Sequence, residues 1–145
     1  MNTARKYRET NIKTASPMQL VLMLYDECLR ALDRADKALD LTGPERIETV
    51  GNHLLHAQDI ITELAVSLDM EQGGEIAANL HNLYDFMINH LSEANVKKER
   101  KPIRDVHKMM SELKEAWQQV EVQNGAQAAP SRPPPIRTSS IQISG

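Results

Sequence analysis

Two histidines have the spacing that comes closest to a metal site. His53 and His56 lie three positions apart, and on a helix this spacing could let both imidazoles hold one ion. No third ligand stands nearby, and di-metal sites of four-helix proteins place a glutamate three residues before each histidine, which neither residue has. We therefore interpret both as surface or interface histidines and expect no metal and no cofactor.

The other reactive side chains do not form a catalytic site either. Cys28 shares the apolar spacing of Leu24 and Leu32, which indicates a buried, inert thiol rather than a nucleophile. Gly73-Gly74 lacks the lysine and the serine or threonine of a phosphate-binding loop, and indicates a break between helical segments. Four aspartates are expected on a solvated face of the first helix: Asp26, Asp33, Asp36 and Asp40. The sequence favours a protein that is not an enzyme, with a carboxylate–metal enzyme as the outside alternative.

Four segments show the apolar spacing of amphipathic helices. The motif Ser-Pro-Met-Gln at 16–19 predicts a capping box before the first segment, and the T-x-x-E pattern at 42–45 predicts another before the second. Breaks follow at 73–74 and at the charged linker 97–102. Side chains expected to hold the core are Leu24, Leu32, Ile61, Leu64, Leu80, Tyr84 and Trp117, and Ile47 is expected to begin the apolar stripe of the second helix. Connections this short predict an all-α fold, an antiparallel up-down-up-down four-helix bundle.

The two ends of the chain differ from this body. Residues 1–15 are expected to form a flexible N-terminal arm, with the bundle at 16–122 and a disordered Pro/Ser-rich tail at 123–145. The stretch 14–120 holds 11 Lys or Arg and 18 Asp or Glu, so its net negative charge argues against nucleic acid as a partner. One cysteine and the lack of an 18-residue apolar run favour a cytoplasmic protein without direct membrane insertion.

The helices carry more apolar residues than one core-facing stripe needs. Residues 20–25 are apolar at six consecutive positions, and the second and third helices are widened in the same way. One interpretation is a thick core with broad helix interfaces. The other is an exposed apolar surface for a partner segment, for which seven methionines are well suited.

The order of several short motifs resembles one known family. They include Asn-Ile-Lys-Thr-Ala-Ser-Pro at 11–17, Leu-Val-Leu-Met-Leu-Tyr-Asp at 20–26, Gly-Gly-Glu-Ile-Ala at 73–77 and Leu-Tyr-Asp-Phe-Met at 83–87. Together with Glu-Ala-Trp at 115–117, they make the chain resemble the flagellin-specific export chaperone family, FliS, over about residues 7–120.

The resemblance implies a cytosolic helical bundle that binds the disordered C-terminal segment of flagellin. Such a chaperone prevents premature polymerisation and hands the subunit to the flagellar type III export gate. The bound segment lays apolar side chains into hydrophobic strips of the bundle. Our candidates for these flagellin-binding strips are Leu22, Met23, Leu29, Ile60, Phe86 and Ile88.

The resemblance also implies an N-terminal gate. Tyr7 and Ile12 match the positions with which the family's arm can cover part of the binding surface when flagellin is absent. Two other uses of the surface stay open. It could be the seam of a weak homo-oligomer, or it could bind another flagellar regulator such as an anti-sigma factor.

Overall fold

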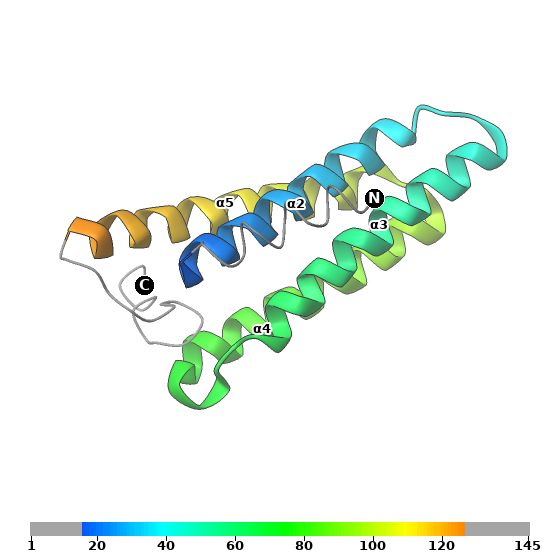
Figure 1. Cartoon of the computed structure of the whole chain (residues 1–145). Coiled ribbons are helices and arrows are strands. Elements are labelled where there is room, and N and C mark those ends of the chain that lie inside the picture. Colours follow the sequence, from blue (N-terminus) through cyan, green and yellow to red (C-terminus); the bar gives the residue numbers. More distant parts are fainter. Residues whose placement is uncertain (1–15, 127–145) are drawn as a thin grey trace.

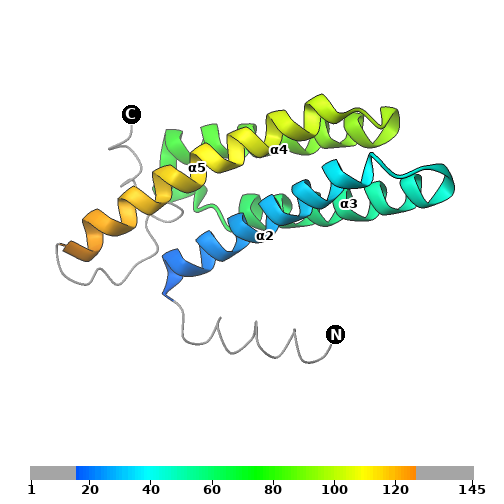
Figure 2. The ribbon, with the colours of Figure 1, turned by 90° about the horizontal axis from the view of Figure 1, so that it is seen from above.

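The computed structural model describes residues 16–126, which form four α-helices around one core (Figure 1). They are α2 (Pro17–Ala38), α3 (Gly43–Val66), α4 (Met70–Lys97) and α5 (Arg100–Ala126). The chain reverses direction at each short connection, and α2 with α5 forms one layer while α3 with α4 forms the other (Figures 1 and 2). The helices pack as a ring, α2 and α4 each contacting both α3 and α5. The described residues contain no strand, so the all-α prediction is confirmed.

The first helix begins as predicted and the second does not. The amide of Gln19 donates to the Ser16 hydroxyl (3.2 Å) and the amide of Ser16 donates to the Gln19 side chain (2.9 Å), which completes the capping box. Thr42 makes no side-chain cap bond. Gly43 has φ +64°, outside the helical region, so the threonine hydroxyl is not placed over the amides of the first turn. The prediction of a second capping box at 42–45 is wrong.

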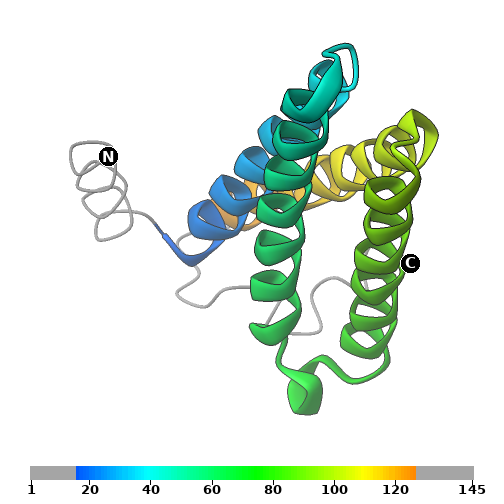
Figure 3. The ribbon, with the colours of Figure 1, turned by 90° about the vertical axis from the view of Figure 1, so that its right-hand side faces the viewer.

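The break predicted at Gly73-Gly74 is confirmed as a kink inside α4. Gly74 has φ +54° and ψ −131°, a combination that only glycine adopts without strain. The first turn of α4, capped by Asp69 on the amide of Gln72 (3.0 Å), therefore points away from the rest of the helix. Figure 3 shows this turn folded across the end of the α3–α4 pair.

The core follows the predicted stripes with two exceptions. Among the expected core residues, those that are buried are Leu32, Ile61, Leu64, Leu80, Tyr84 and Trp117. Leu24 is half-buried, and Ile47 is 59% exposed, so the prediction for Ile47 is wrong. Its neighbour Arg46 turns inward instead and donates to the carbonyls of Leu39 (3.0 Å) and Lys98 (3.4 Å), which ties three helix ends together.

The bundle extends further than predicted at one end. Helix α5 runs to Ala126, four residues past the expected boundary at 122. The predicted arm at 1–15 and the tail from 127 lie outside the described residues. Within 16–126, no helix combines the length and apolar character that crossing a lipid bilayer requires.

Candidate functional site

A row of ion pairs runs along the seam between α2 and α5. Three aspartates of α2 and Asp40, just after its end, each have a cationic or imidazole partner on α5, because that helix presents basic residues at the matching levels. The shortest of these ion pairs joins Lys114 Nζ to Asp26 Oδ1 at 2.5 Å. The pairs are Asp36 with Arg100 and Arg104, Asp40 with Arg100, Asp33 with His107, and Asp26 with Lys114. Asp33 and Asp40 are exposed as expected, whereas Asp26 and Asp36 are half-buried, and all four also take part in ion pairs that the sequence did not indicate.

A hollow of about 220 Å³ lies within this seam. Its walls come from both helices, namely Leu32, Asp33, Asp36, Ile103, Arg104, His107 and Lys108. Two of its carboxylates already pair with two of its basic groups. The hollow therefore presents charges of both signs and is not a site of one charge for an ionic ligand.

Two candidate binding residues lie along the same seam. Leu22, Asp26, Leu29 and Asp33 are separated by steps of four, three and four residues, so they share one face of α2. Both leucines are half-buried and pack against the core. Along this face Leu29 falls between the ion-paired Asp26 and Asp33, and Leu22 lies one turn before Asp26.

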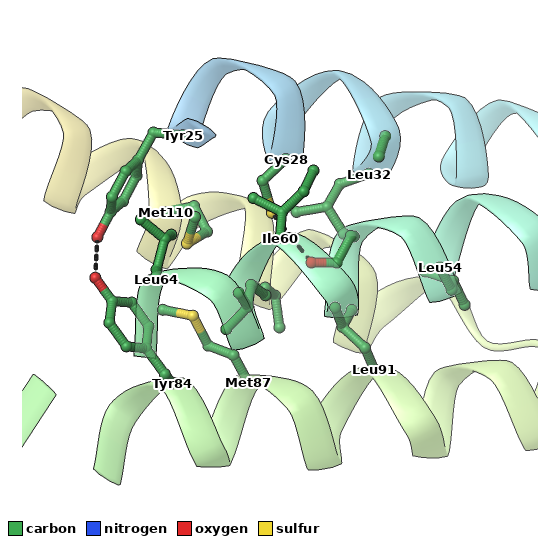
Figure 4. Packing of buried hydrophobic residues seen from close by; sticks show 14 of the residues in the cluster. Tyr25, Cys28, Leu32, Leu54, Ile60, Leu64, Tyr84, Met87, Leu91 and Met110 are labelled. Atoms are coloured by element: carbon green, nitrogen blue, oxygen red, sulfur yellow. Dashed lines mark hydrogen bonds between the residues drawn. The ribbon is translucent and has the colours of Figure 1, made fainter. Parts of the chain in front are cut away.

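The seam between α2 and α3 separates two other candidates. Glu27 Oε2 lies 2.8 Å from His56 Nε2 across this seam. Met23 lies four residues before Glu27 and Ile60 four after His56, so in this antiparallel pair they occupy the same level. Met23 is half-buried, whereas Ile60 is only 4% exposed because α2 covers it, next to Cys28 and Leu32 (Figure 4). The prediction of Ile60 as a surface residue is wrong.

Phe86 is the most accessible of the candidates. Its side chain is 48% exposed and stacks on His90, with ring centroids 4.9 Å apart and planes at 23°. His90 Nε2 lies 3.2 Å from Asp105 Oδ2 on α5. Phe86 therefore stands beside the seam between α4 and α5, partly shielded on one side by an imidazole that is itself held in place.

Ile88 lies at the remaining seam, between α3 and α4. Its side chain is half-buried against the core, and its carbonyl accepts a hydrogen bond from Gln58 Nε2 (2.9 Å). The same amide nitrogen donates to the Ser92 hydroxyl (2.8 Å). This seam is thus joined by neutral hydrogen bonds.

The six predicted binding residues do not form one continuous patch. One is buried, and the other five are spread over all four seams of the ring: Leu22, Leu29, Met23, Phe86 and Ile88. Helical periodicity places each on the flank of a core stripe, but the neighbouring helix determines how much of that flank stays open. A partner that touches all five must pass around the bundle.

Four half-buried apolar residues of α4 and α5 were not predicted as surface residues. Met109 was not singled out, and three others were assigned to the core or its stripes: Ile76, Leu83 and Leu113. All four are half-buried and pack against the core from outside. The four-residue step from Met109 to Leu113 was the available signal, since it puts both on one flank of α5.

Three aromatic side chains bring their polar atoms together inside the core. The hydroxyls of Tyr25 and Tyr84 are 2.5 Å apart (Figure 4). Burial raises the pKa of Tyr25 to about 12, although the hydroxyl of Tyr84 and the indole of Trp117 oppose the shift. Burial also raises the pKa of Tyr84 well above its usual value. Trp117 Nε1 makes no hydrogen bond within the described residues. The indole is nevertheless close enough to the Tyr25 hydroxyl to lower its pKa.

The structure buries Cys28 and partly desolvates His53. Cys28 is fully buried as predicted, its Sγ lies 3.9 Å from the Ala57 carbonyl oxygen, and burial raises the pKa of its thiol to about 12. Desolvation lowers the pKa of His53, and the nearby charge of Arg34 lowers it further. In residues 16–126, no three His, Cys, Asp or Glu side chains gather in a way that could hold a metal ion.

The predicted gate cannot be compared with this geometry. Tyr7 and Ile12 lie outside the described residues, before Ser16. The described residues begin at Ser16, six residues before Leu22.

Comparisons with known proteins agree over most of the chain. Residues 1–124 match the family described as Flagellar protein FliS. The flagellar secretion chaperone FliS of Salmonella typhimurium is 40% identical over 113 residues, which cover 77% of this chain and 82% of that protein. The protein of the same name from Vibrio cholerae is 37% identical, with 77% and 80% covered. That from Bacillus subtilis is 31% identical, with 81% and 85% covered.

The family match covers residues in all four helices and at every seam described above. The family match ends at residue 124, two residues before the end of α5. The resemblance drawn from short motifs is therefore confirmed over the whole bundle. The chain belongs to the FliS family of flagellar secretion chaperones.

Proposed function

We propose that this protein is a cytosolic chaperone for flagellin. It binds the disordered C-terminal segment of the subunit, prevents its premature polymerisation and delivers it to the flagellar type III export apparatus. Family membership supports this role, since the relatives are named flagellar secretion chaperones. The structural observation that carries it is the set of half-buried and exposed apolar side chains on all four seams of the bundle.

The placement of these residues favours a long, unfolded ligand. A rigid globular partner contacts one side of a bundle, whereas a disordered segment can wrap around several sides and order as it binds. Leu22 and Leu29 on one seam and Ile88 on the opposite seam cannot be covered together by a flat surface. A segment that passes from seam to seam, extended in places and helical in others, covers them in turn.

We expect Phe86 to contribute more to the binding free energy of the ligand than any other candidate residue. About half of its side chain is exposed, and covering roughly 100 Å² of aromatic surface contributes about 2 kcal/mol. Its loss corresponds to roughly a thirtyfold weaker affinity. Leu22, Leu29 and Met23 have less exposed surface, so each contributes less.

Calorimetric titration of a synthetic flagellin C-terminal segment into the full chain tests this proposal. We expect binding to wild type and roughly thirtyfold weaker binding to Phe86→Asp. Val96→Asp is the matched control, because Val96 is 84% exposed, lies on the same helix and belongs to none of the seam sites. Absence of binding to the wild type would refute the function. Equal binding by Phe86→Asp and Val96→Asp would refute only the site.

Sedimentation with the same segment separates a chaperone from a self-associating bundle. We expect one mass, that of a monomer, in sedimentation at micromolar concentration with and without the segment. A dimer that dissociates when the segment is added would assign the apolar surface to a seam between copies. Pull-down from flagellated cells then distinguishes flagellin from an anti-sigma factor or another regulator as the main partner.

The gate is the remaining part of the proposal. An arm that covers the site through Tyr7 and Ile12 lowers the apparent affinity by the fraction of time the site is open. Tyr7→Asp combined with Ile12→Asp should therefore strengthen binding of the flagellin segment. Unchanged or weaker binding by this variant would contradict the gate and leave the rest of the proposal standing.

A further inference from the structure

A shallow hollow of about 450 Å³ lies at the turn between α3 and α4. Its walls are residues 66–71, which run from the last residue of α3 into the first turn of α4. Figure 3 shows this turn at the outer end of the α3–α4 pair. We call this site the turn hollow.

Two apolar side chains stand open at the turn hollow. Val66 is 79% exposed and Met70 is 49% exposed, whereas Leu68 between them is buried. Neither of the two exposed residues is among our candidates for flagellin binding. The turn hollow is therefore a separate surface, which the seam sites do not explain.

Local hydrogen bonds hold the backbone of the turn in place. The Ser67 hydroxyl donates to the carbonyl of Leu64 (2.8 Å), and the Asp69 carboxylate accepts from the amide of Gln72 (3.0 Å). The amide of Gly73 donates to the Asp69 carbonyl (2.7 Å). Because the surface is already ordered, a partner that binds here immobilises little of the turn.

Backbone and side chains both make the turn hollow negative. Helix α3 ends here with no basic residue in its last turn, so the negative end of its dipole is not offset. No described residue donates to the carbonyls of Val66 and Ser67. Glu63, three residues before Val66, and Glu71, in the wall, are exposed and form no ion pair among residues 16–126. The site thus offers several acceptors to a positively charged group.

The surroundings of the turn hollow carry charge of the same sign. Residues 47–96, which make up nearly all of α3 and α4, contain eight Asp or Glu and no Lys or Arg. Arg46 and Lys97, the cations that flank this stretch, lie at the opposite ends of the two helices. Glu75, in the second turn of α4, is exposed and has no ion-pair partner in the part of the chain that is described. The two helices therefore attract a basic partner towards the turn and repel an acidic one.

We propose that the turn hollow docks a basic segment of a partner protein and takes one Lys or Arg side chain of that segment. The charged group of this side chain lies near the free carbonyls at the end of α3 and the carboxylate of Glu71. Its apolar stem packs on Val66 and Met70. A basic side chain thus supplies donors to the acceptors and covers the apolar edge at the same time, which an acidic or a purely apolar residue does not. The site goes beyond the proposed function, since none of its residues belongs to the seam sites.

Chemical-shift mapping on the ¹⁵N-labelled full chain tests this site without flagellin, so its outcome does not depend on the proposed function. The probe is the capped peptide Ala-Leu-Lys-Leu-Ala, and its counterpart has Glu in place of Lys. We expect the Lys peptide to shift the amides of residues 63–75, with a dissociation constant on the order of a millimolar. The Glu peptide should leave these amides unchanged.

Two pairs of variants separate the turn hollow from the rest of the acidic bundle. Glu63→Gln combined with Glu71→Gln should weaken binding of the Lys peptide about fivefold. Glu45→Gln combined with Glu48→Gln is the matched control, because it removes two exposed carboxylates at the other end of α3. Val66→Ser should weaken binding about threefold, and Val96→Ser, which changes an exposed valine at the far end of α4, should not.

Four results would overturn the proposal. Equal shifts with the Lys and the Glu peptide would show that charge does not select the partner. Shifts concentrated around Leu22 or Phe86 would place the basic peptide on the seams instead. Equal weakening by the two double Gln variants would reduce the effect to a general attraction by an acidic bundle. Concentration-dependent shifts at residues 63–75 without any peptide would assign the turn to a contact between copies of the chain.

Discussion

The paired hydroxyls of Tyr25 and Tyr84 allow a quantitative test of the core. Both groups are buried, and each is the other's hydrogen-bond partner at 2.5 Å. Replacing either tyrosine by phenylalanine keeps the ring but leaves one hydroxyl buried without its partner, at a cost of about 1–3 kcal/mol in the free energy of unfolding. Replacing both removes both polar groups together, so the double variant should lose much less than the sum of the single variants.

Urea unfolding provides the assay, with Trp117 as the reporter. It is the only tryptophan and is buried close to the hydroxyl of Tyr25, so its emission follows this part of the core directly. We expect lower midpoints and unchanged slopes for both single variants. If the losses of the two single variants simply add in the double variant, or if neither single variant loses stability, the hydroxyl pair does not contribute as described.

Three further outcomes follow from local geometry. Ser16→Ala should cost about 1 kcal/mol in unfolding experiments because it breaks a capping box, whereas Thr42→Ala, which removes no cap bond, should cost clearly less. Gly51→Ala should stabilise the bundle by up to about 1 kcal/mol, since the added Cβ meets its nearest atom at an ordinary 3.6 Å; Gly74→Ala should destabilise it, because φ is +54°. A lower melting temperature for Gly51→Ala, or a higher one for Gly74→Ala, would contradict this. Finally, the raised pKa of Cys28 and of the two core tyrosines means that the unfolded chain loses these protons first as pH rises. Stability should therefore be intact below about pH 9 and fall steadily towards pH 12, and a flat stability profile over that range would refute the burial argument.

Local chemistry was sufficient to predict most of the fold. The capping box at Ser16 and the break at Gly74 depend on residues next to each other in the chain, so the sequence alone indicates them. The second cap failed because Gly43 takes a backbone conformation that a T-x-x-E pattern does not reveal. The prediction that Ile47 is buried failed because Arg46, one position earlier, turns inward and binds two carbonyls at the ends of other helices.

The candidate site was less predictable because it depends on how helices cover one another. Ile60 and Phe86 both flank a core stripe, yet α2 covers the first, whereas the second is left half open. Periodicity within one helix contains no information on which flank a neighbour occupies. For the same reason the ion pairs of the α2 aspartates were not predicted, and Met109 was not recognised as a half-buried residue.

The two opposite seams of the ring respond differently to dissolved salt. The α2–α5 seam is held on its outer side by accessible charges, and Arg104, for example, is 65% exposed, so added ions weaken its attractions. The α3–α4 seam is joined through the neutral amide of Gln58, on which ionic strength has little effect. At higher ionic strength the bundle should therefore loosen first along the α2–α5 seam, on which Leu22 and Leu29 lie.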